Sequence, residues 1–143
     1  MTFSPREWSI GRHTLRHEQP DVLWVDYQGE LTLAESVLFV ELFRELAATQ
    51  PFFLMGDLTH VTPLAREVRE YISENVRPEW MLSSIYIGAR LLMRAVARGV
   101  VLAAYMIGRA DKRAVDTVHF VSTRTEAYEL ADRLRGIPSH RVA

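Results

Sequence analysis

The chain has 143 residues, of which 48% are hydrophobic, and its 17 Lys plus Arg residues nearly balance its 18 Asp plus Glu residues. This length predicts a single domain over residues 1–143, large enough to bury a core without disulfides or a metal. The balanced charge argues against nucleic acid as a partner. The absence of cysteine excludes disulfide scaffolds, thiolate metal sites and cysteine nucleophiles.

The N-terminal residues lack the apolar segment of a signal peptide, and no uncharged apolar run reaches the ~20 residues that a membrane-spanning helix needs. We therefore expect a cytoplasmic protein without a membrane span. The sequence predicts no cofactor.

The N-terminal part of the chain is predicted to form a hairpin. Residues 8–17 alternate partly between apolar and polar side chains, as in a half-exposed edge strand. Residues 18–21 contain Pro20 and indicate a turn, and residues 22–27 form a second strand that pairs with the first. Residues 28–30 end this strand.

A helix is predicted from Thr32 to about residue 48. Thr32 and Glu35 have the spacing of a capping box, in which each side chain accepts a hydrogen bond from the other residue's backbone N–H. The broad apolar face of this helix comprises Leu38, Phe39, Leu42, Phe43 and Leu46. Its opposite, charged face comprises Glu41, Arg44 and Glu45.

The short run from Phe52 to Met55 is the strongest strand signal in the chain. It is apolar at every position, so both of its faces are expected to be buried, as in the middle of a sheet covered on both sides. The strand is predicted to end at Asp57, where a polar loop begins. Thr62 followed by Pro63 predicts the start of a second helix, with Thr62 as its N-cap.

The alternation of helix and strand continues beyond this point. The second helix is predicted to end before Pro78, and residues 84–88 form another central strand. Residues 90–107 predict a third helix, which is the most apolar part of the chain. Residues 117–121 predict a last strand.

The C-terminal helix has its own start and stop signals. Thr123 and Glu126 have the spacing of a second capping box, and Gly136 followed by Pro138 ends the helix. Its apolar stripe comprises Ala127, Leu130, Ala131 and Leu134. Residues 137–143 are expected to be a loose tail, so the core covers about residues 8–136.

The predicted elements follow the order strand, strand, helix, strand, helix, strand, helix, strand, helix (ββαβαβαβα). Strands that alternate with helices need crossover connections and form a parallel sheet, to which the N-terminal hairpin adds an antiparallel edge. The predicted fold class is therefore α/β, with a small and mostly parallel sheet. No glycine-rich loop joins a strand to a helix, which excludes a Rossmann or P-loop nucleotide site.

Three short segments resemble the STAS or SpoIIAA-like domain of anti-anti-sigma factors: GELTL at residues 29–33, DLTHV at residues 57–61 and VHFVSTRTEAY at residues 118–128. The resemblance covers roughly residues 21–135 and implies the SpoIIAA-like fold. In that family, a partner kinase phosphorylates a serine at the start of the helix after the second segment. Here residues 65–68 (AREV) stand at that place, so the chain is similar to divergent members that lack the phosphorylatable serine.

This resemblance implies a regulatory or protein-interaction module that acts by binding rather than by catalysis. Its partner would be an unknown protein, or a second copy of the chain in a homodimer. In some divergent members, the space between sheet and helices has been proposed to hold an apolar ligand. The alternative function is therefore a carrier or sensor of a small apolar, lipid-like molecule.

The candidate binding loop comprises Asp57, Thr59, His60 and Thr62. It follows the carboxyl end of a central strand, which is where α/β proteins usually bind their ligands. Each residue also has an ordinary structural alternative. Asp57 is expected to accept N–H bonds from the loop, Thr62 to cap the helix, and His60 to face solvent.

Neither catalysis nor metal binding is predicted. No second catalytic group lies close in sequence to His60, and an enzyme ranks behind both binding functions. The N-terminal histidines, His13 and His17, have no third metal ligand near them, and His119 is expected to be a core histidine.

The helix predicted over residues 90–107 is the second candidate surface. Its apolar side chains include Leu92, Met93, Val96, Val100 and Tyr105. They suit plain core packing, a dimer surface, or the wall of a pocket for an apolar ligand. The sequence does not separate the last two alternatives.

Overall fold

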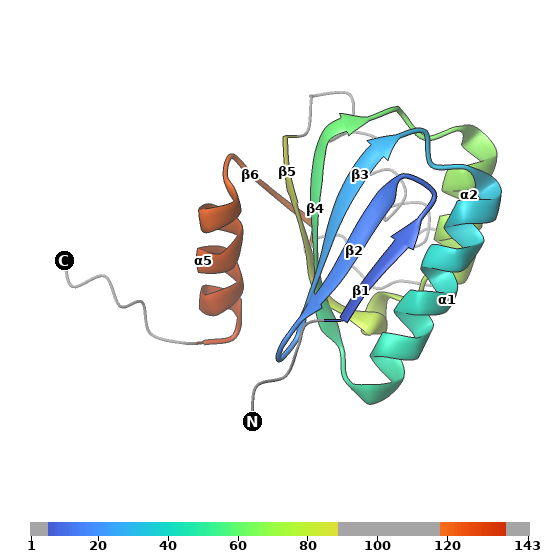
Figure 1. Ribbon diagram of the computed structural model, residues 1–143. Helices are drawn as coiled ribbons and strands as arrows, with labels where there is room; N and C mark the ends of the chain where they lie inside the picture. The colour runs from blue at the N-terminus through green and yellow to red at the C-terminus, as the bar shows by residue number, and fades with distance from the viewer. Residues whose placement is uncertain (1–5, 89–117, 137–143) are drawn as a thin grey trace.

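The computed structural model of the protein describes residues 6–88 and 118–136. These residues form one six-stranded sheet with the strand order β1-β2-β3-β4-β5-β6 (Figure 1). The strands are β1 (Arg6–Ile10), β2 (His13–Glu18), β3 (Val22–Gly29), β4 (Phe52–Val61), β5 (Met81–Ile87) and β6 (Val118–Val121).

Helices cover both faces of the sheet. α1 (Leu33–Thr49) and α2 (Arg66–Asn75) lie on one face, and α5 (Arg124–Leu134) lies on the other (Figure 1). A short 3-10 helix, η1 (Pro78–Trp80), leads into β5. The strands from β3 to β6 pair in parallel, whereas β1, β2 and β3 pair antiparallel. The predicted α/β class, with a parallel core and an antiparallel N-terminal part, is confirmed.

The core lies on both sides of β3 and β4, whose side chains alternate between the two faces. Leu23 and Leu54 belong to the apolar cluster beneath α1 and α2, whereas Trp24 and Phe53 belong to the cluster beneath α5. Residues 52–55 are each at most 4% exposed, which confirms the predicted central strand. Because helices cover both faces, this run has no position at which a polar side chain would reach water.

The prediction of one strand over residues 8–17 is wrong, because the chain forms two strands there, β1 and β2, joined at Gly11 and Arg12. Gly11 has a φ of 61°, a left-handed conformation that suits the first central position of a two-residue hairpin. A Cβ atom at this position would overlap the carboxylate of Glu35 on α1. The hairpin turn therefore needs glycine for both its conformation and its close approach to α1.

The prediction that Thr62 caps the second helix is also wrong. β4 continues to Val61, and the N–H of Thr62 donates to the carbonyl oxygen of Gly29 at 2.9 Å, which ties Thr62 to β3. The helix α2 begins only at Arg66, and its N-cap residue, Ala65, makes no side-chain capping bond. Pairing with β3 thus overrides the local signal for a helix start.

The two predicted capping boxes differ in outcome. At α1 the box is complete, since Thr32 Oγ1 accepts the N–H of Glu35 at 3.1 Å and Glu35 Oε1 accepts the N–H of Thr32 at 3.0 Å. At α5, Thr123 Oγ1 accepts the N–H of Glu126 at 3.1 Å, as predicted. The carboxylate of Glu126, however, accepts the N–H of Ser122, one residue earlier than a capping box requires.

Two leucines assigned to apolar helix faces are exposed, Leu38 by 50% and Leu134 by 46%. Leu38 lies on the side of α1 that also carries the exposed Glu41, one helical turn further on. Leu134 is the last residue of α5. Ala127 and Ala131 of α5 are fully buried, and Leu130 and Tyr128 pack against the same cluster.

The strands predicted at residues 84–88 and 117–121 correspond to β5 and β6. The helix predicted over residues 90–107, with its candidate surface, lies outside the described residues. Within the described ranges, no helix is long and apolar enough to cross a membrane.

Candidate functional site

The strand β4 extends beyond its neighbour β5. The pairing of β4 with β5 ends at Asp57, opposite Ile87, whereas β4 continues to Val61. Residues 58–61, which we call the projecting end of β4, pair with β3 through Gln28, opposite His60, and through Gly29. On their other edge, no strand among the described residues accompanies them.

The base of the projecting end is held in one conformation by Asp57. Its Oδ1 atom accepts the N–H of Thr59 at 2.9 Å and the hydroxyl of Thr59 at 2.5 Å. The prediction that Asp57 binds the N–H of a following residue is confirmed. Gly88, the residue after β5, has a φ of 70° and passes so close to Thr59 that a Cβ atom would overlap its hydroxyl oxygen.

His60 and Thr62 complete the predicted set, and the side chains of Thr59, His60 and Thr62 are exposed. The residues predicted as a binding loop therefore lie together, but on a strand and its immediate continuation rather than on a loop. Asp26 of β3 is the register partner of Asp57, which places two carboxyl-bearing residues side by side. In the described part of the chain, no group of three or more His, Cys, Asp or Glu residues is arranged to hold a metal ion.

Position 56 lies on β4, shortly before the projecting end. Aromatic rings on the α1 and α2 side of the sheet leave room there only for glycine. A Cβ atom there would lie 2.9 Å from a ring carbon of Tyr27 and 3.1 Å from one of Tyr86. Burial raises the pKa of Tyr27 well above its usual value, with a further contribution from Tyr86. Burial also raises the pKa of Tyr86, against the opposing effect of a hydrogen bond with Ser84. Both phenols are thus protonated near neutral pH, and their rings pack against the backbone at Gly56.

The sequence alone gives His13 no role, since no third metal ligand lies near it and His17. Its side chain is fully buried. Its Nδ1 atom accepts the N–H of Gln28 at 3.0 Å, and its Nε2 atom lies 3.1 Å from the carbonyl oxygen of Glu30. The signal in the sequence is the alternation from Arg12 to Arg16, in which His13 and Leu15 point inward while their neighbours are exposed.

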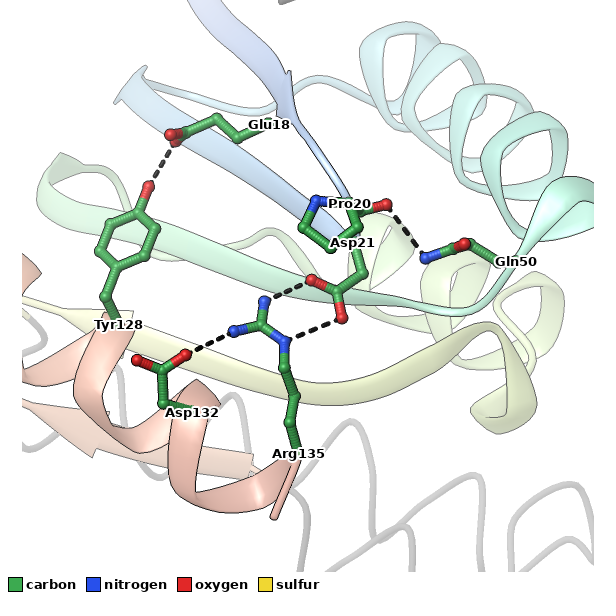
Figure 2. Close-up of polar contacts among 7 residues, drawn as sticks. All are labelled: Glu18, Pro20, Asp21, Gln50, Tyr128, Asp132 and Arg135. Atoms are coloured by element: carbon green, nitrogen blue, oxygen red, sulfur yellow. Dashed lines mark hydrogen bonds and ion pairs between the residues drawn. The ribbon is translucent and has the colours of Figure 1, made fainter. Parts of the chain in front are cut away.

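A separate set of polar contacts binds α5 to the turn between β2 and β3 (Figure 2). The hydroxyl of Tyr128 donates to Glu18, and the guanidinium of Arg135 donates to both carboxylate oxygens of Asp21. On the other side of the turn, the amide of Gln50 donates to the carbonyl oxygen of Pro20 at 3.0 Å. This turn precedes β3, so it lies at the opposite end of the sheet from the projecting end of β4. We regard these contacts as structural.

The second candidate surface stays a prediction. Its residues, Leu92, Met93, Val96, Val100 and Tyr105, all lie outside the described part of the chain.

The sequence matches no protein-family model and no curated protein. A comparison of structures finds a similar fold in the crystal structure of an uncharacterised protein of the DUF3478 family from Shewanella loihica PV-4, which has a SpoIIAA-like fold. The TM-score is 0.54, the alignment covers 91% of this chain and 97% of the other, and 14% of the aligned residues are identical. This chain therefore has a SpoIIAA-like fold, as the resemblance in its sequence implies. Similarity at this level extends to the fold alone.

Proposed function

We propose that the protein is a non-catalytic interaction module that binds a protein partner through the projecting end of β4 and the adjoining Thr62. The observation that carries this proposal is the extension of β4 past β5, which leaves one edge of residues 58–61 without a strand neighbour among the described residues. An open strand edge presents backbone donors and acceptors in fixed positions, which is how many domains bind a partner segment.

The chemistry of this edge favours binding over catalysis. The carboxylate of Asp57 is engaged by Thr59. His60 is exposed, and no described hydrogen bond places an acid or a base beside it. A catalytic histidine is normally oriented by a second group within hydrogen-bond reach. The near-neutral charge of the whole chain favours a protein partner over a nucleic acid.

The proposal is tested by placing a photo-crosslinking amino acid at His60 and, in a second variant, at Arg16. Arg16 is also exposed but lies on β2, in the antiparallel part of the sheet. Proteins captured at His60 and not at Arg16 are identified, purified, and titrated against the wild type and a Thr59→Lys variant. We expect Thr59→Lys to weaken binding by roughly tenfold or more, as at the centre of an interface, and an Arg16→Ala control to leave it unchanged.

Equal binding by the wild type and Thr59→Lys would contradict the proposal. Native mass spectrometry of the same protein distinguishes the alternatives. A retained apolar molecule without a crosslinked protein would favour a carrier, and a dimer crosslinked through His60 would identify a second copy of the chain as the partner.

A further inference from the structure

The hydrogen bonds of His13 define the chemical state of its ring. A backbone N–H can only donate and a carbonyl oxygen can only accept. Nδ1, which accepts the N–H of Gln28, therefore carries no proton, and Nε2, which faces the carbonyl oxygen of Glu30, carries one. The buried imidazole is neutral and in a single tautomer.

The ring takes the place of a strand backbone. The backbone pairing of β2 with β3 ends at Thr14, opposite Asp26, because at His13 the chain is already turning toward β1. Gln28 and Glu30 flank Gly29, whose φ of 70° departs from an extended strand, and the N–H of Gln28 and the carbonyl oxygen of Glu30 both face the ring of His13. By bonding to both, the imidazole of His13 continues the ladder where the backbone of β2 has left it.

The segment held by His13 is the one that supports the projecting end of β4. Gln28 and Gly29 pair with His60 and Val61, and the carbonyl oxygen of Gly29 accepts the N–H of Thr62. The register of β3 with β4 shifts between Asp26 and Gln28, so regular pairing does not continue smoothly into this segment. Among the described strands, these last residues of β3 are the only neighbours of the projecting end.

We propose that His13 is the positioning residue of the candidate binding edge, and that its side chain fixes the end of β3 against which β4 projects. The biological meaning of this proposal rests on the proposed function, whereas the experiment that tests it does not. The ring is itself held by edge-to-face contacts with Tyr27 and Phe39, whose centroids lie 5.8 Å and 5.7 Å away. The carboxylate of Glu35, on α1, lies 3.4 Å from Nε2.

Nuclear magnetic resonance on the isolated protein tests the proposal in two ways. The imidazole 15N shifts of His13 near neutral pH are expected to report the neutral tautomer with the proton on Nε2. Hydrogen exchange of the Thr62 amide then reports the anchoring of the projecting end. In His13→Phe, which retains an aromatic ring but neither hydrogen bond, we expect Thr62 to exchange roughly tenfold faster or more, beyond the change in global stability.

Two further variants separate positioning from general loss of stability. Asn places its side-chain oxygen near the position of Nδ1, so His13→Asn is expected to restore part of the protection of Thr62. Ile85→Val removes a methylene from the core on the opposite face of the sheet and serves as the control. It is expected to change the exchange of Thr62 only in proportion to global stability.

Two results would overturn the proposal. One is an imidazole of His13 that is protonated on Nδ1. The other is an exchange rate of the Thr62 amide that changes only in proportion to global stability in His13→Phe and His13→Asn, as it does in Ile85→Val. If His13→Phe does not fold, His13→Asn and the 15N shifts decide the question. These measurements need no partner. Failure of the crosslinking experiment with a positive exchange result would therefore refute the interaction function and leave the positioning role of His13 intact.

Discussion

Gly11 and Gly29 have nearly the same backbone conformation in different surroundings. Their φ angles are 61° and 70°, both in the left-handed region that side chains other than glycine adopt only with strain. A Cβ atom at Gly29 would have nothing within 4 Å, whereas a Cβ atom at Gly11 would overlap the Glu35 carboxylate of the α1 capping box. Comparison of these two positions therefore separates backbone strain from the contact between hairpin and helix.

At the residue scale, we predict that Gly11→Ala is more destabilising than Gly29→Ala. Gly29→Ala should lower the free energy of unfolding by about 1 kcal/mol through backbone strain. Gly11→Ala should lower the free energy of unfolding by about 1 kcal/mol more than Gly29→Ala does, because displacing Glu35 breaks one half of the capping box. Urea unfolding followed by circular dichroism measures both, and equal losses would show that the carboxylate moves away without consequence.

At the scale of elements, α5 is attached differently from α1. The helix α1 buries large side chains such as Phe39 and Phe43, whereas the buried side chains of α5 are Ala127 and Ala131. Polar contacts also attach α5, and those of Tyr128 and Arg135 are made to residues at the turn between β2 and β3 (Figure 2). The hydrogen bond to Asp21 raises the pKa of Arg135.

We predict that Arg135→Met lowers the free energy of unfolding by about 3 kcal/mol, because it leaves the carboxylate of Asp21 without its cation. Asp21 is only 7% exposed, so water replaces little of the lost interaction. The double variant Arg135→Met with Asp21→Leu should be more stable than Arg135→Met alone, since it removes the unpaired charge. A double variant less stable than the single one, measured by urea unfolding, would contradict this account.

At the scale of the whole molecule, residues at the ends of helices on both faces of the sheet bond to the β2–β3 turn. Gln50, at the end of α1, bonds to Pro20, and Arg135, at the end of α5, bonds to Asp21. His17, on β2, lies near this turn and is the register partner of Arg6 on β1. Partial burial lowers the pKa of His17, the charge of Arg6 lowers it further, and Asp21 opposes both. The folded state thus favours the neutral form of this side chain.

This shift makes the stability of the protein depend on pH. A group whose folded pKa is depressed contributes stability above its unfolded pKa, about 6.5 for histidine, and the contribution is lost as the pH falls through the folded value. We therefore predict that stability falls on acidification and that His17→Gln reduces this fall. Thermal unfolding at a series of pH values measures it, with His60→Gln at an exposed position as the control. An unchanged slope in His17→Gln would refute the assignment to this residue.

Local patterns were sufficient to predict much of the fold. The apolar run at residues 52–55 predicts a strand buried on both faces, because every side chain in it is apolar and is more stable away from water. Thr32 and Glu35 predict the start of α1. Helices between the strands predict parallel pairing, because two parallel strands are joined by a crossover connection that is usually a helix. The sequence also places Asp57, Thr59, His60 and Thr62 close together, simply because they are neighbours in the chain.

Contacts between distant segments decided the rest. Thr62 and Pro63 have the local pattern of a helix start, but the hydrogen bond from Thr62 to Gly29 continues the strand instead. The binding loop thereby becomes a projecting strand end. His13 acquires its role only because the fold brings Gln28 and Glu30 to its two ring nitrogens. Short-range patterns encode which backbone conformation a segment prefers, whereas the partners of its backbone groups are determined only when the sheet is assembled.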